Sequence, residues 1–299
     1  MSFKVWMVEV RAPFLLLPII LSLVGSFLAL YNGVFDALNF ILFTAVLLLL
    51  HVTVNTLNEY YDNKTGIDLH TNRTMFNGGT GTLQNGLLAP RQVLGMAIGC
   101  FIIAAIISAV LVVRVGPVLI PLVLMGMVFA LFYTQIFARN MLGEISAGLG
   151  LGFLPVVGAY MVHIPLLSIG CLVLAVAAGI LTFNLLLLNE FPDVEADTRG
   201  GRKNLAIKLG PRRAAVLYSA LTFLVYGILL VFVLLQMIPT LCLLGLVTFP
   251  FAYKAATTSF SDPTRVESFV HALKANVQVV LITQVLVVIG IGASLLLRS

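Results

Sequence analysis

The sequence contains few charged residues, a single tryptophan and only three cysteines. Asp, Glu, Lys and Arg together make up 10% of the 299 residues, whereas a soluble domain carries about 25%. This low charge content excludes an ordinary soluble globular domain. The cysteines, Cys100, Cys171 and Cys242, stand alone inside apolar runs, and their spacing fits neither a disulfide framework nor a zinc site.

Hydrophobic residues form 60% of the chain, and the mean hydropathy is +1.09. Apolar runs of about 20 residues, each long enough to span a bilayer, recur along the whole length. The first run is too long for a removable signal peptide and lacks a small-residue cleavage site. We therefore expect an all-α polytopic membrane protein that forms a single domain over 1–299. Its nine transmembrane helices are predicted at roughly 13–33, 38–60, 91–113, 117–137, 141–162, 166–190, 212–235, 239–257 and 272–297.

Basic residues are distributed unevenly over the connections between these spans. One side of the membrane holds the N-terminus and the connections 61–90, 138–140, 191–211 and 258–271. That side, counted with the adjacent span ends, carries all of the 17 Lys and Arg residues except Arg114 and Arg298. Such a bias marks the cytoplasmic side, so we expect a plasma-membrane protein with a cytoplasmic N-terminus and polar cap and an outer C-terminus.

The net charge of +5 is concentrated on that side, where it favours anionic headgroups or an anionic substrate. Nucleic acid is a poor partner for this composition because the chain has no basic soluble module. The expected partners are therefore the lipid bilayer and small substrates, and the sequence indicates no obligate protein partner.

Two long connections contain the same polar pattern. The motifs at 55–68 and 189–202 both include NExxD, with an offset of 131 residues. A further carboxylate follows in each motif, Asp68 in the first and Asp197 in the second, and each connection ends in Pro-Arg. Four spans separate the copies, so they keep the same orientation and form a parallel internal repeat. We expect the two motifs to lie at one depth and to face each other.

Helical spacing gathers the polar side chains of each motif. The residues that share a face are Asn55, Asn58 and Asp62 in the first motif and Asn189, Asp193 and Asp197 in the second. The second set shares a face only if the helix continues past Pro192, which lacks an amide hydrogen and bends a helix.

Carboxylates from two segments repel one another unless cations or protons lie between them. Because no Cys or His cluster accompanies them, the ligands are oxygens, which favour Mg²⁺ or Ca²⁺. Mg²⁺ commonly takes one or two carboxylates and completes its shell with water and substrate phosphate. Basic residues of the same connections complete a phosphate site: Lys64, Arg73, Arg202, Lys203 and Lys208. The pattern predicts a diphosphate held by Mg²⁺, as two ions, between the motifs.

A hydrophobic diphosphate at the membrane face is typical of an isoprenyl diphosphate. Cations would stabilise the departing diphosphate while the allylic C–O bond ionises. Aromatic faces and exclusion of water would protect the carbocation, and the candidates are Tyr60, Tyr61, Tyr133, Phe137, Phe153 and Tyr160. An ion- or proton-coupled transporter is the alternative of a different class, although its acids belong near the midplane and these lie at span ends.

The motifs resemble those of the UbiA superfamily of intramembrane aromatic prenyltransferases. NxxNExxDxxxGxD at 55–68 is similar to the family's first aspartate-rich motif, and NExxDxxxDxxxGRKxLAxxLG at 189–210 is similar to its second. The resemblance implies nine helices around a central cavity, a cytoplasmic polar cap and an opening to lipid. It implies that Mg²⁺ and diphosphate are bound by Asn58, Asp62, Asp193 and Asp197 and that the diphosphate also meets Arg73, Arg202 and Lys203.

Other residues of the two motifs complete the candidate site. Asp68 is a further candidate metal ligand, and the candidate substrate-binding residues include Asn55, Lys64 and Asn189. Glu59 stands where the family usually has Asp, which leaves open whether Glu59, Glu190 and Glu195 touch metal. The Gly-rich stretch at 76–86 departs from the family pattern and is predicted to form a lid or an anion-binding backbone nest.

Shorter stretches are similar to the menaquinone branch of the family, which prenylates 1,4-dihydroxy-2-naphthoate. They are YT at 133–134, LGE at 142–144 and VVGAY at 156–160. Tyr133 and Glu144 are accordingly candidate acceptor-binding residues, although the macrodipole alone favours a Glu at a helix N-terminus. The resemblance implies prenyl transfer to this naphthoate, with a glycerophosphate acceptor of ether-lipid synthesis as the alternative.

Overall fold

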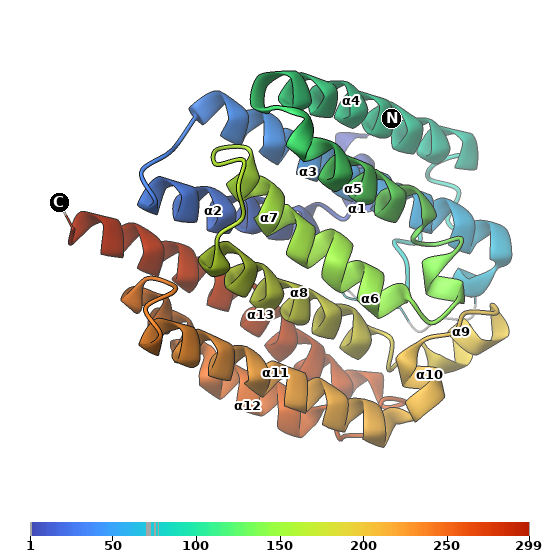
Figure 1. The fold of residues 1–299 in the computed structure, drawn as a ribbon. Coiled ribbons are helices and arrows are strands. Elements are labelled where there is room, and N and C mark those ends of the chain that lie inside the picture. Colours follow the sequence, from blue (N-terminus) through green and yellow to red (C-terminus); the bar gives the residue numbers. More distant parts are fainter. Residues whose placement is uncertain (1, 70–72, 75, 77, 299) are drawn as a thin grey trace.

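The computed structural model describes residues 2–69, 73, 74, 76 and 78–298, apart from the side chains of residues 69, 266 and 268. Every regular element in these ranges is helical, and the long helices lie side by side in one bundle (Figure 1). Eight of the helices that the structure describes are long and apolar enough to cross a membrane. The predicted class, an all-helical polytopic membrane protein, is therefore confirmed.

Several candidate spans combine two or three consecutive helical elements. The spans are Ala12–Tyr31 (η1, Ala12–Leu15, and α2, Leu16–Tyr31), α3 (Ala37–Thr65), α4 (Pro90–Val115), Gly143–Met161 (α6, Gly143–Ala147, the π-helical η5, Gly148–Phe153, and α7, Leu154–Met161), α8 (Ile169–Asn189), α11 (Pro211–Leu234), Thr240–Thr258 (η6, Thr240–Thr248, and α12, Phe249–Thr258) and Phe269–Leu296 within α13 (Val266–Leu296). The shorter elements are α1 (Phe3–Glu9), η2 (Ile67–Leu69), η3 (Pro117–Leu119), α5 (Ile120–Phe132), η4 (Phe137–Arg139), α9 (Val194–Arg199) and α10 (Leu205–Leu209).

The span predicted at 117–137 is shorter than expected. The apolar helix there covers only Pro117–Phe132, and its 16 residues extend roughly 24 Å at 1.5 Å per residue. A bilayer core is about 30 Å thick, so this helix alone does not reach across it. The count of nine spans stays a prediction, as does the cytoplasmic position of the polar cap.

Glycine allows the helices of the bundle to approach closely. A Cβ atom on Gly25 of α2 would lie 2.3 Å from the carbonyl oxygen of Val156 in α7, and one on Gly290 of α13 would lie 2.1 Å from the carbonyl oxygen of Leu241. Small residues at helix contacts suit a membrane protein because lipid provides no hydrophobic drive between helices, and close packing decides their association.

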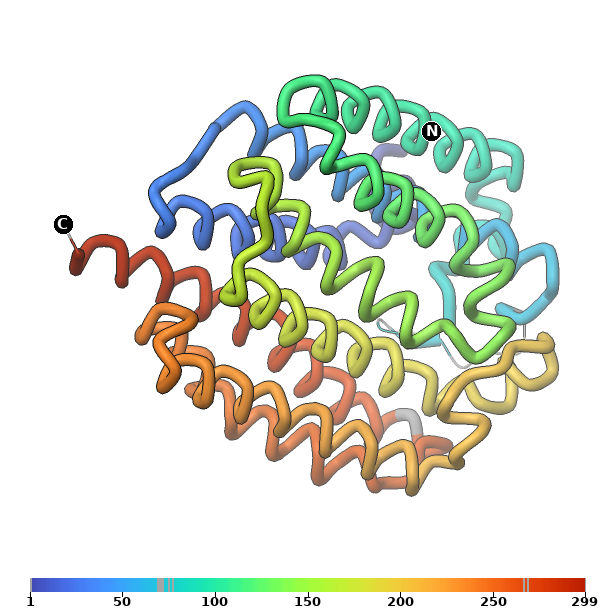
Figure 2. Tube along the Cα trace, in the orientation of Figure 1, coloured from blue at the N-terminus to red at the C-terminus, as the bar shows by residue number. Residues whose placement is uncertain are grey.

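Both polar motifs lie at one end of the bundle. α3 ends at Thr65, and its C-cap residue Gly66, with a φ of 75°, turns the chain into η2. α8 ends at Asn189, and the chain turns through Pro192 before α9 begins, so the second motif does not continue one helix. Figures 1 and 2 show α9 and α10 near the end of α3, at the end of the bundle opposite the C-terminus. The meeting of the two motifs therefore depends on the break after α8.

A hydrogen-bonded cluster, here called the clasp, fastens the N-terminal segment and the Gly-rich stretch to α3. It consists of Glu9, Arg11, Glu59, Thr80 and Thr82. The Glu59 carboxylate accepts from Arg11 at 2.7 Å and from the Thr80 amide at 2.9 Å. Glu9 accepts from the hydroxyls of Thr80 and Thr82, and burial, with a contribution from Glu59, raises the pKa of Glu9.

The clasp gives Glu59 a structural contact on the side of the N-terminal segment. Within the part of 76–86 that the structure describes, which leaves out residue 77, Thr80 and Thr82 are anchored by carboxylates of α1 and α3. Asn55 adds a further tie, because its amide donates to the carbonyl of Val10 at 3.0 Å. The Gly-rich stretch is therefore attached to the helices at two threonines.

Replacing Glu59 by Gln removes the charge that pairs with Arg11 and nearly preserves the side-chain volume. The Glu59 side chain is 0% exposed and that of Arg11 is 24% exposed, so the arginine would lose its partner in a largely buried setting. We expect a loss of about 1–3 kcal/mol of stability, measured as a lower Tm in detergent. Glu195→Gln is the matched control, because its pair with Arg199 is exposed at both ends; equal Tm values for the two variants would contradict the clasp.

The predicted orientation is tested by labelling the two ends of the bundle. Lys208 in α10 is exposed beside the second motif, and Leu297 is 79% exposed near the C-terminus. In a background without the native cysteines, Leu297→Cys should react with a membrane-impermeant thiol reagent in intact cells. Lys208→Cys should react only after permeabilisation, and reaction of both variants from the same face would refute the predicted topology.

Candidate active site

One guanidinium joins the two motifs. Arg202 donates through Nη2 to Asp62 of the first motif and through Nη1 to Asp197 of the second, the latter at 3.2 Å. Asp62 and Asp197 are 5% and 1% exposed. Burial by itself would lower the pKa of Arg202, but the two carboxylates outweigh burial and hold the pKa above its ordinary value. The predicted meeting of the acidic motifs thus has a definite centre, occupied by a cation from the protein itself.

The turn after α9 is arranged around Asp197. Asn204 donates to Asp197 Oδ2 at 2.9 Å, and its own side-chain oxygen caps α10 by accepting from the Ile207 amide at 2.8 Å. Gly200 permits close contact with the first motif, since a Cβ atom there would lie 2.0 Å from a side-chain carbon of Ile67 in η2. The sequence between the second carboxylate and α10 therefore fixes how α9 lies against η2.

The remaining predicted ligands surround this centre to different degrees. Asn58, one turn before Asp62, donates to the Thr134 hydroxyl at 3.4 Å. Asp193 is half-buried at the N-cap of α9. The side-chain oxygen of Asn189 is buried and, among the described residues, has no hydrogen-bond partner. Such an orphaned buried acceptor suits a cation.

These donors fit a hard divalent ion in kind. They are carboxylate and amide oxygens, the ligands that Mg²⁺ takes, with one or two carboxylates sufficing when phosphate completes the shell. Within the described ranges, no three His, Cys, Asp or Glu side chains stand close enough to hold a metal by themselves. The fit therefore requires that a substrate supply part of the shell and that Arg202 give up part of its contact with the carboxylates.

Asp68 and Arg73 face the Gly-rich stretch. Asp68 Oδ2 accepts from Gln84 at 3.1 Å, and a Cβ atom on Gly79 would lie 2.7 Å from the same oxygen. Burial raises the pKa of Asp68 to about 7, with further contributions from Asp62 and Glu59. Arg73 donates to the carbonyls of Gly78 and Asp68 at 3.0 and 3.1 Å. Both side chains brace the loop at the edge of the centre.

Two further basic residues lie at the rim. Lys64 is exposed in the last turn of α3, and the Lys203 side chain is exposed beside Arg202. The Lys203 backbone accepts from the Met141 amide at 3.0 Å and so attaches the second motif to the connection before α6. Glu195 lies outside the centre, with its side chain 80% exposed and paired with Arg199.

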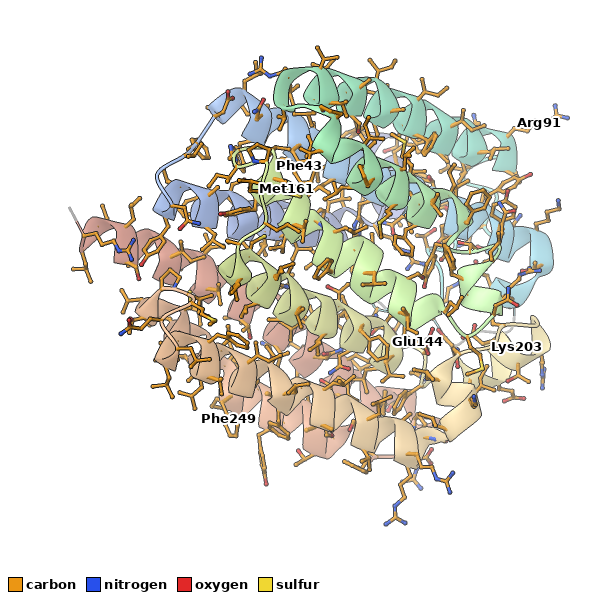
Figure 3. All side chains as sticks on the ribbon, viewed as in Figure 1. Phe43, Arg91, Glu144, Met161, Lys203 and Phe249 are labelled. Atoms are coloured by element: carbon orange, nitrogen blue, oxygen red, sulfur yellow. The ribbon has the colours of Figure 1, made fainter. Side chains whose placement is uncertain are left out.

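Glu144 and Glu190 form a second acidic pair, which the spacing of the motifs did not reveal. Glu144 is fully buried, and its Oε1 accepts from the Leu205 amide at 2.5 Å. The half-buried Glu190 carboxyl lies close enough to Glu144 for their charges to interact, and one oxygen of each lacks a hydrogen-bond partner among the residues that the structure describes. Two carboxyls so placed need a proton or a cation between them. Figure 3 shows Glu144 at the same end of the bundle as Lys203.

An apolar pocket leads from the polar end into the bundle between α3, α4, α5 and the α6–α7 span. Tyr133, Ser146 and His51 are polar members of its lining. The lining comes from helices with continuous apolar sequence, so no sequence signal marks these residues apart from the polar His51 in its apolar run.

The candidate aromatic residues are only partly at this pocket. Tyr133 lines it, and Phe137 packs against the lining residue Phe129 with ring centroids 5.4 Å apart. Tyr160 is different: its hydroxyl accepts from Asn32 at the end of α2, away from the motifs. The expectation that Tyr160 shields a carbocation at the site is therefore wrong, because α7 carries it to the far end of the bundle.

Comparison with known proteins gives a consistent result. The profile of the UbiA prenyltransferase family matches residues 16–293. The 1,4-dihydroxy-2-naphthoate octaprenyltransferase of Bacillus subtilis (strain 168) is 28% identical over 201 residues, which cover 66% of this chain and 63% of that protein. The protein of the same name from Mycobacterium tuberculosis is 31% identical over 215 residues, 71% of each chain.

A solved structure shares the fold. The UbiA homolog from Archaeoglobus fulgidus bound to GPP and Mg²⁺ superimposes with a TM-score of 0.61 at 15% identity, covering 97% of this chain and 99% of that chain. The family profile runs across both acidic motifs and every helix that lines the pocket. The chain therefore belongs to the UbiA prenyltransferase family.

Proposed function

We propose that this protein transfers the prenyl group of an isoprenyl diphosphate to an aromatic acceptor, 1,4-dihydroxy-2-naphthoate, in a reaction that depends on Mg²⁺. The observation that carries the proposal is the meeting of Asp62 and Asp197 at Arg202, at the polar end of an apolar pocket. This arrangement suits a substrate with a charged diphosphate head and a hydrocarbon tail. The names of the two bacterial relatives support the naphthoate as acceptor.

The diphosphate would lie between the two motifs. Mg²⁺, when bound, would be held by Asn58, Asp62, Asp193 and Asp197, with Asp68 at the edge, and would supply positive charge to the departing diphosphate. Arg202 already lies between the carboxylates and would turn part of its guanidinium to phosphate oxygens. Lys64, Arg73 and Lys203 at the rim would add further positive charge.

Bond breaking would be assisted by electrostatics and by the exclusion of water. The allylic C–O bond breaks with its electron pair leaving on the diphosphate, and the basic residues stabilise that charge as it develops. The ring of Tyr133 lines the pocket where the carbocation would form and would stabilise it through its face. The apolar lining below keeps water from the cation.

The acceptor would bind beside the second acidic pair. Tyr133 lies within electrostatic reach of Glu190, Arg202 and Glu144, so a naphthoate hydroxyl would donate to a carboxylate while the acceptor's own carboxylate meets a basic group. A ring carbon attacks the cation at the carboxyl-bearing position, and loss of CO₂ then restores aromaticity. We further propose that this face is cytoplasmic in the plasma membrane, as the basic residues predict.

Removing either carboxylate of the centre should stop turnover. We expect Asp62→Asn and Asp197→Asn each to lower kcat roughly 10³-fold or more, because several kcal/mol of charge stabilisation would be lost. Prenyl transfer by purified protein with a radiolabelled allylic diphosphate measures this effect, and EDTA should abolish activity until Mg²⁺ is restored. Asp262→Asn, which changes an exposed pair with Arg265, is the matched control. If the kcat of Asp62→Asn or Asp197→Asn lies within tenfold of the kcat of this control, the replaced carboxylate is not an essential ligand.

The acceptor is decided by product analysis. With 1,4-dihydroxy-2-naphthoate and glycerol phosphate offered at equal concentration, we expect prenylated naphthoquinol and released CO₂. Formation of an ether-linked glycerophosphate without naphthoate turnover would show that the acceptor is a glycerophosphate, and it would leave the proposed diphosphate chemistry unchanged. Glu144→Gln should raise the KM for the naphthoate more than the KM for the prenyl donor. An equal effect on both KM values would show that Glu144 does not bind the acceptor.

A further inference from the structure

The apolar pocket has a definite axis. Its lining on α3 runs from Val54 near the motif to Phe43 deep in the bundle, a distance of roughly 16 Å at 1.5 Å per residue. On α5 the lining runs from Tyr133 to the residues before the helix, ending at Leu119. Figure 3 shows Phe43 toward the end of the bundle opposite Glu144 and Lys203. The pocket therefore runs parallel to α3 and away from the polar centre.

A polar network blocks the way beyond Phe43. Asn39, one turn before Phe43, donates to the carbonyl of Val162 at 2.8 Å and accepts from Arg114 Nε at 2.8 Å. Arg114 also pairs with Asp36, the N-cap of α3, at 3.3 Å. These contacts join the outer ends of α3, α4 and α7. A hydrocarbon chain that enters from the polar centre would meet Phe43 as the last pocket-lining side chain of α3 before this network.

Gly158 of α7 determines where the Phe43 ring lies. A Cβ atom on Gly158 would lie 2.3 Å from Phe43 Cζ and 3.0 Å from a methyl group of Leu122. Only a residue without a side chain lets the ring pack this closely against α7 at this point, since a distance under 3.0 Å to a Cβ atom would require the ring to move. Phe43 is 5% exposed and borders the pocket, so any movement of its ring changes the end of the pocket.

We infer that Phe43, packed on Gly158, is the floor of the prenyl pocket and limits the donor chain to about four to five isoprene units. The inference rests on the proposed function, which supplies the isoprenyl donor. Asn58 and Phe43 are 15 residues apart on α3, or roughly 22 Å. An isoprene unit adds four backbone bonds of about 1.5 Å each, so it extends the chain by roughly 5 Å.

Binding of non-reacting prenyl thiodiphosphates with two, four and eight isoprene units tests the floor without reference to the acceptor. In the presence of Mg²⁺, the unaltered protein should bind the four-unit analogue at least tenfold more tightly than the eight-unit analogue. Phe43→Ala should weaken this preference, because it frees the space of the ring as far as Asn39, which is roughly one further isoprene unit at 1.5 Å per residue. Gly158→Ala and Phe43→Trp should instead weaken binding of the four-unit analogue at least tenfold relative to the two-unit analogue.

The double variant Phe43→Ala with Gly158→Ala separates the floor from a general packing defect. If the new methyl group acts by displacing the Phe43 ring, the double variant should show the length profile of Phe43→Ala, which is a non-additive result. Gly227→Ala and Phe260→Ala are the matched controls, because Gly227 has open space around it and Phe260 is 51% exposed away from the pocket. Both controls should keep the profile of the unaltered protein.

Two results would overturn the inference in different ways. If the analogues bind but Phe43→Ala and Phe43→Trp share the profile of the unaltered protein, Phe43 is not the floor, whereas the proposed function stands. Equal binding of the four-unit and eight-unit analogues by the unaltered protein would likewise show that Phe43 does not limit the chain, and the proposed function would stand. If none of the three analogues binds in the presence of Mg²⁺, the proposed donor class is wrong and the floor fails with it.

Discussion

The pairing of Asp62 and Asp197 with Arg202 is the interaction on which the rest of the polar end depends. Two carboxylates that are 5% and 1% exposed cannot lie close together at the end of a membrane bundle without a cation. The guanidinium provides that cation and makes the contact of α3 with the second motif favourable. α8 ends before Pro192, and the chain turns there. Asp197 therefore reaches this centre from the separate helix α9, whereas a continuous helix would have carried Asp197 elsewhere.

Most of the charge lies at one end of the molecule, and an apolar path starts beside it. A diphosphate could replace part of the protein's own ion pairing at the polar end, whereas a hydrocarbon tail would meet a mainly apolar lining below. Positions of α8 that lie 131 residues beyond the α3 lining also line a second, smaller pocket: Leu174, Ala177, Ala178 and Leu181 correspond to Phe43, Val46, Leu47 and Leu50.

The clasp connects the N-terminal segment with the loop that covers the first motif. Glu59 lies between the candidate ligands Asn58 and Asp62 in sequence, yet its carboxylate is committed to Arg11 and Thr80. A helix turns about 100° per residue, so neighbours in NExxD point to different partners. One half of the motif can therefore hold the loop in place while the other half faces the second motif.

Sequence patterns alone determined the membrane class, the approximate position of most spans and the residues Asp62, Asp197 and Arg202 as one candidate centre. These features follow from hydrophobic run length, helical spacing and repeated motifs, which are local properties of a chain. Tertiary structure decided the partner of each polar group: Glu59 in the clasp, Asp68 and Arg73 against the Gly-rich stretch, Glu144 beside Glu190, and Tyr160 far from the site. It also decided the pocket and its end at Phe43 and Gly158. In a helix that is apolar on every face, the sequence carries no period that tells a lipid-facing side chain from a pocket-facing one, and only the packing of the helices against one another makes that distinction.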